Sequence, residues 1–62
     1  MAYNIKKIRE EKKMTQEQLS KLSGVSRTTI IKLENSEDAE VQVGTLKALA
    51  TALSVPVSKL FG

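Results

Sequence analysis

Two capped helices with a glycine between them dominate the middle of this 62-residue chain. Thr15 and Gln18 stand at the spacing of a capping box, in which each side chain bonds the backbone N–H of the other residue. Gly24 follows and can adopt the left-handed conformation that commonly ends a helix. Ser26 is then suited to cap a second helix. The sequence therefore predicts two short helices joined by a tight turn.

The remaining segments predict three more helices and no strand. Asn4 can cap the first helix, and Pro56 is well placed in the first turn of the last. The fourth helix carries Leu46, Leu49 and Leu53 at helical spacing. We expect an all-α fold with five helices, at about residues 4–13, 15–23, 26–35, 43–53 and 56–61, in one domain spanning 1–62.

Apolar residues at helical spacing predict a single core. A chain this short buries only about 60% of its unfolded surface. It has no cysteine and no histidine, so neither a disulfide nor zinc can reinforce that core. The predicted core residues are Ile5, Ile8, Leu19, Leu22, Val25, Ile30, Leu33, Val43, Leu46, Leu49, Ala50, Leu53 and Leu60.

Charge is unevenly distributed along the chain. The net charge is +3, but residues 1–35 hold eight Lys or Arg against four Glu, whereas residues 36–62 hold two Lys against three acids. The basic half contains the two capped helices, as phosphate binding requires. A solvated lysine-rich surface is the alternative explanation. No apolar run is long enough for a signal peptide or a membrane span, and we expect a soluble, cytoplasmic protein.

Composition argues against several functional classes. An enzyme is the least favoured functional hypothesis. The chain has no histidine, no cysteine, no glycine-rich phosphate loop and no obvious carboxylate pair. Tyr3 and Phe61 are the only aromatic residues, too few to stack the bases of a single strand. We expect no cofactor, metal ion or small-molecule ligand.

The chain resembles the phage-repressor and Cro-type helix-turn-helix family (XRE-like) of bacterial and phage regulators. The resemblance covers nearly the whole chain and rests on Ile8-Arg9, Lys12-Lys13, Met14-Thr15-Gln16, Leu19-Ser20, Gly24-Val25-Ser26, Ile30, Leu33-Glu34, Thr45-Leu46, Leu53-Ser54-Val55 and Leu60-Phe61. It implies a lambda-repressor-like domain whose second and third helices form the motif. It also implies a nucleoid-associated repressor that binds palindromic double-stranded DNA as a homodimer.

The resemblance assigns roles to individual side chains. Arg27 and Thr28 match positions that contact base edges, although an ordinary exposed helix face remains the alternative. Lys32 lies one turn further along the same face and could reach another guanine or a phosphate. Gln16 would contact a phosphate and brace the first residue of the recognition helix. Further backbone contacts are expected from Thr15, Thr29, Asn35, Lys12, Lys13 and the region of Gly44 and Thr45.

Two other sets of residues are expected to have structural roles, the first of them by the same resemblance. Arg9 and Glu34 would form a partly buried ion pair that joins the first helix to the third. The apolar end of the chain, with Pro56, Val57 and Phe61, would either contact a second copy or simply close the bundle.

The chain departs from the family pattern in several places. Ser20 replaces a usual alanine and leaves a hydroxyl that needs a partner, and Ser36 replaces a usual glycine. The connector at 36–42 carries Glu37, Asp38 and Glu40, so no phosphate contact is expected from residues 37–40. Ile31 stands where the family usually has a polar residue; it could pack on the fourth helix, contact a thymine methyl or be incidental.

An antitoxin or protein-interaction module with this fold is the alternative function.

Overall fold

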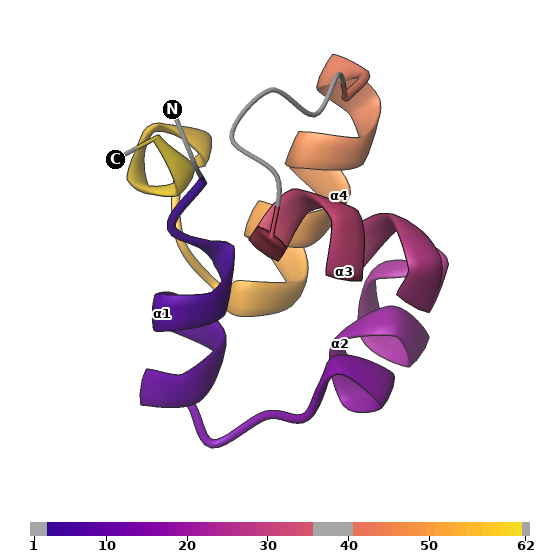
Figure 1. Ribbon diagram of the computed structural model, residues 1–62. Helices are drawn as coiled ribbons and strands as arrows, with labels where there is room; N and C mark the ends of the chain where they lie inside the picture. The colour runs from indigo at the N-terminus through magenta and orange to yellow at the C-terminus, as the bar shows by residue number, and fades with distance from the viewer. Residues whose placement is uncertain (1–2, 36–40, 62) are drawn as a thin grey trace.

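Four α-helices and one short 3₁₀-helix make up the described part of the chain, residues 3–35 and 41–61 of the computed structural model. They are α1 (Ile5–Glu11), α2 (Gln16–Ser23), α3 (Arg27–Asn35), α4 (Val43–Leu53) and η1 (Val57–Leu60) (Figure 1). Over these residues the only β-type pairing is an isolated antiparallel bridge between Tyr3 and Phe61. The fold is therefore all-α, as predicted.

The expected count of five α-helices is not confirmed. The segment predicted as a helix over 56–61 is a single 3₁₀ turn at Val57–Leu60. Phe61 has extended backbone angles, φ −91° and ψ 125°, because it pairs with Tyr3 instead of continuing the turn. The acidic part of the predicted connector, with Ser36, falls on residues 36–40, outside the described residues.

The ends of α2 and the start of α3 follow the predicted signals. Thr15 Oγ1 accepts from the backbone N–H of Gln18 at 3.0 Å, and Gln18 Oε1 accepts from the backbone N–H of Thr15 at 2.8 Å, which completes the capping box. Gly24 ends α2 with φ +74°. Ser26 Oγ accepts from the backbone N–H of Thr29 at 3.2 Å and caps α3.

Helix α1 differs from the prediction at both ends. Asn4 makes no side-chain cap bond; its backbone N–H instead donates to the carbonyl of Leu60 at 2.8 Å. The helix ends at Glu11, short of the expected boundary near Lys13. Lys13 has φ +56°, and the backbone N–H of the next residue, Met14, donates back to the carbonyl of Arg9 at 3.0 Å. These are the features of a Schellman motif, which ends the helix with a left-handed residue that is not glycine.

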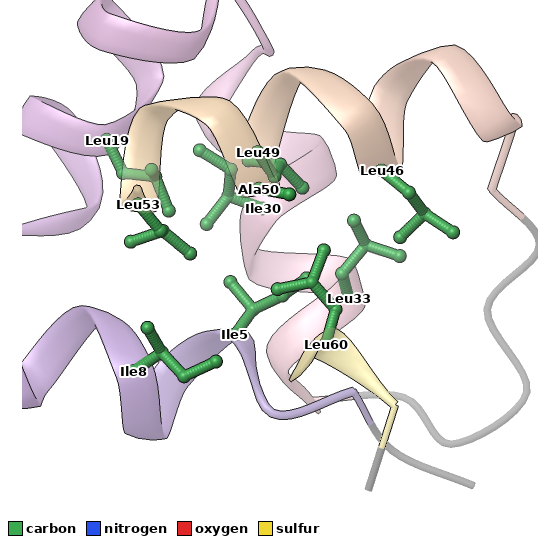
Figure 2. Packing of buried hydrophobic residues seen from close by; sticks show 10 residues of the cluster. All are labelled: Ile5, Ile8, Leu19, Ile30, Leu33, Leu46, Leu49, Ala50, Leu53 and Leu60. Carbon is green, nitrogen blue, oxygen red and sulfur yellow. The ribbon is translucent and has the colours of Figure 1, made fainter. Parts of the chain in front are cut away.

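One hydrophobic cluster lies between the helices (Figure 2). Helix α3 packs against α1 and α2, and α4 packs against α1, α2 and η1. Each fully buried leucine or isoleucine side chain adds roughly 1.5–3 kcal/mol of transfer free energy. The cluster therefore holds α3 in a fixed position. Its members are Ile5, Ile8, Leu19, Ile30, Leu33, Leu46, Leu49, Ala50, Leu53 and Leu60.

Two residues predicted for the core are at the surface. Leu22 is 63% exposed and Val43 is 68% exposed. Each lies in a terminal turn, Leu22 in the last turn of α2 and Val43 at the first position of α4. Helical spacing places Leu22 beside the buried Leu19, but spacing does not show where neighbouring helices stop covering a face. Val25, in the turn, is half-buried and packs against the cluster.

Candidate nucleic-acid interface

Helix α3 is buried on one side and polar on the other. Ile30 and Leu33 are 0% and 1% exposed and face the core. Arg27, Thr28 and Lys32, the predicted base-contacting residues, are all exposed. The structure thus leaves the N-terminal turn of α3 and the face that follows it accessible to a partner.

An ion pair fixes the other end of α3. Arg9 Nε lies 2.8 Å from Glu34 Oε2, and Arg9 Nη2 donates to Glu34 Oε1 at 3.2 Å. The side chains are only 11% and 1% exposed, respectively. The hydrogen bond to Glu34 raises the pKa of Arg9, an effect that burial opposes in part, so the guanidinium stays charged. Arg9 and Glu34 are therefore joined as the family resemblance implies.

Gln16 extends this ion pair into a network. Its side-chain Nε2 donates to Glu34 Oε1 at 3.0 Å, and Arg9 Nη1 donates to the carbonyl of Met14 at 2.7 Å. This hydrogen bond from the Gln16 amide reaches the last turn of α3, whereas the brace suggested by the resemblance would reach the first residue of that helix. One amide N–H of Gln16 is left to donate elsewhere. The network joins α1, the turn before α2 and the end of α3.

A shallow, open depression brings four of the predicted contact residues together. Lys13, Thr15, Gln16 and Arg27 line it, in company with Arg9, Met14 and two acids, Glu10 and Glu17. The hydroxyl oxygen of Thr15 is occupied by the cap bond, but its proton remains available to an acceptor. This surface runs from the end of α1 to the start of α3.

The other predicted backbone contacts do not line this depression. Lys12 lines an adjoining depression with Lys21 and Leu22, which shares Lys13 and Met14 with the first. Thr29 is half-buried, and its hydroxyl lies 2.9 Å from the hydroxyl of Ser26. Asn35 is exposed at the opposite end of α3, and Gly44 and Thr45 lie in the first turn of α4.

The turn between α2 and α3 contains contacts that sequence reasoning missed. Ser20 Oγ donates to the carbonyl of Val25 at 2.7 Å, so the hydroxyl that replaces alanine has a partner. Ser23 Oγ accepts a hydrogen bond from the backbone N–H of Val25 at 3.1 Å. Both bonds hold the turn, and therefore the angle between the two helices. The sequence signals were the serines near a glycine turn and, at Ser20, a hydroxyl that needed a partner, but neither identified that partner.

The apolar C-terminal residues are placed differently from one another. Val57 is half-buried and packs against the core. Phe61 is 55% exposed, and its ring centroid lies 5.7 Å from that of Tyr3, with the ring planes inclined at 57°. Pro56 is exposed. Phe61 and Pro56 therefore remain accessible, whereas Val57 helps to close the bundle.

The described residues offer neither a metal-binding cluster nor a membrane-spanning helix. Residues 3–35 and 41–61 contain no group of three or more acidic, histidine or cysteine side chains placed to hold a metal ion. Within these ranges no helix has the length and apolar character needed to cross a bilayer.

Comparison with known proteins agrees with this geometry. The helix-turn-helix family model matches residues 5–60, and the chain belongs to that family, of the Cro and repressor type. Over 56 residues, or 90% of this chain, it is 39% identical to the HTH-type transcriptional repressor RghR of Bacillus subtilis and 38% identical to the uncharacterized HTH-type transcriptional regulator RghRB of the same organism. The matched segment spans 42% and 40% of those proteins. No solved structure matches significantly.

Proposed function

We propose that this chain binds double-stranded DNA in a sequence-specific manner and regulates transcription. The observation that carries the proposal is the exposed face of α3, which holds Arg27, Thr28 and Lys32 on a helix packed firmly into the core. An α-helix fits the B-DNA major groove, and in this class of motif the N-terminal residues of the second helix contact base edges.

Arg27 and Thr28 are the proposed base-reading residues of the first turn. A guanidinium can donate to both O6 and N7 of guanine, a contact that is worth about 1–3 kcal/mol of discrimination. A threonine can exchange a hydrogen bond with a base or place its methyl group against a thymine. Lys32, further along the same face, would reach a guanine or a phosphate.

The depression at the start of α2 is the proposed phosphate site. Lys13 supplies positive charge, and the remaining amide N–H of Gln16 and the hydroxyl proton of Thr15 supply donors. The N-terminus of a helix also favours an anion through its free N–H groups and dipole. Because Gln16 is held by Glu34, its donor would be positioned before DNA arrives. Lys12, Thr29 and Asn35 are secondary candidates, on account of their less central placement.

We further propose that the chain acts as a repressor and binds as a homodimer. RghR is described as a repressor, which favours that direction of regulation. A single α3 covers only a few base pairs, and two copies of it about 34 Å apart would read a palindromic site. The exposed Phe61 and Pro56 are the proposed dimer contacts, with Val57 behind them.

Selection of bound duplexes from a random DNA pool tests the proposal. The purified chain should enrich a palindromic site, and its affinity should fall steeply with salt concentration. Arg27→Ala should relax the preference at one base position in each half-site and leave the other positions unchanged. Lys13→Glu is the matched control, since it should weaken binding to all sequences alike. The absence of DNA binding even at low salt would favour the protein-interaction alternative.

A further inference from the structure

Ile31 is an apolar residue on the outward face of α3. Its neighbours Ile30 and Leu33 are buried at 0% and 1% exposure, whereas Ile31 is 37% exposed. At 3.6 residues per turn, Ile31 projects about 40° from Arg27 and about 60° from Thr28 around the helix axis. It therefore lies between the two proposed base-reading residues in projection, one turn further along the helix.

The surroundings of Ile31 favour a negatively charged partner. The exposed face of α3 carries Arg27 and Lys32 and no acid, because the only acidic side chain of α3, Glu34, is turned into the ion pair with Arg9. Because Ile31 lies between two cations, the best complementary partner has an apolar group flanked by negative charge. The major groove offers both, since phosphates border it and the C5-methyl group of thymine lies on its floor.

We propose that Ile31 is a specificity-determining residue that contacts the C5-methyl group of a thymine. This inference rests on the proposed DNA binding and adds one base position to it. A β-branched side chain in a helix is nearly confined to one χ1 rotamer, so its methyl groups project in a fixed direction. The contact would distinguish thymine from cytosine, which lacks the C5-methyl group, at one step of each half-site.

Replacing thymine by uracil tests the contact, because only the C5-methyl group is removed. Each thymine of the selected half-site is replaced in turn, and the dissociation constants of the duplexes are measured at one salt concentration. The wild-type chain should lose affinity by about fourfold at the thymine that Ile31 contacts, the value of one buried methyl group. Ile31→Ala should bind the thymine and uracil duplexes equally well at that position, and Ile31→Val should retain most of the difference.

Leu22→Ala is the matched control, since Leu22 is also an exposed apolar residue but lies on α2. It should leave the whole uracil profile unchanged. Identical profiles for the wild-type chain and Ile31→Ala, with specific binding intact, would overturn the assignment of Ile31 and leave the proposed function standing. Failure of the wild-type chain to select any site would overturn the proposed function itself.

Discussion

Removal of the Glu34 carboxylate should be among the most damaging single changes in this protein. In the native state the carboxylate accepts two hydrogen bonds from Arg9 and one from Gln16, and its side chain is 1% exposed. The variant Glu34→Ala would leave the Arg9 guanidinium, itself only 11% exposed, with the Met14 carbonyl as its remaining acceptor. A buried charge that loses its partner costs far more than the intact pair contributes.

The expected magnitude follows from this burial. Breaking a buried ion pair from one side costs about 3–5 kcal/mol. A domain of 62 residues has a total free energy of unfolding of roughly 3–9 kcal/mol. Glu34→Ala should therefore remove a large part of the stability and lower the Tm by about 12 °C or more.

Urea unfolding followed by circular dichroism measures this loss. Glu17→Ala is the matched control, since its partner Lys21 lies 3.6 Å away but both side chains are mostly exposed. That control should change the free energy of unfolding by less than about 1 kcal/mol. The double variant Arg9→Met with Glu34→Leu should recover most of the loss. A cost for Glu34→Ala no greater than that of Glu17→Ala would refute the reasoning.

The pH dependence of this loss has a defined sign. The hydrogen bond to Glu34 raises the pKa of Arg9. The contribution of this hydrogen bond to the free energy of unfolding is therefore fully present below the ordinary pKa of arginine. That contribution is lost only as the pH rises through the raised value, far above neutrality. The arginine side of the pair should therefore add no pH dependence to the cost of Glu34→Ala between about pH 6 and about pH 9.

Two smaller effects should follow from the helix ends, both measurable by thermal unfolding. Thr15→Ala removes the cap bond to Gln18 and should lower the free energy of unfolding by about 1 kcal/mol. Thr51→Ala, at an exposed position within α4, is the control and should be nearly neutral. Equal losses for the two variants would contradict the capping role of Thr15. Gly24→Ala should cost about 1–2 kcal/mol because φ is +74°, although nothing lies within 4 Å of the added Cβ. Gly44→Ala, with equally open space but no positive φ, should not destabilise; an equal loss there would contradict the role assigned to the positive φ of Gly24.

The features that the sequence determined are those encoded by near neighbours in the chain. The capping box of Thr15 and Gln18, the left-handed Gly24 and the cap at Ser26 are local chemistry, because each forms within a few residues. Most of the core followed from helical spacing for the same reason. The exposed polar face of α3 was also readable, since the buried Ile30 and Leu33 define the opposite side.

Tertiary structure decided what depends on distant segments. Spacing alone placed Leu22 and Val43 in the core, but nothing in their own helices showed that no neighbour would cover them. Lys13 in a left-handed conformation had no glycine to signal it. The hydrogen bond from Gln16 to Glu34 joins residues eighteen positions apart and exists only because the packed helices bring α2 and the end of α3 together. Local rules act over one turn of chain, whereas burial and long-range bonds depend on where the other helices stop.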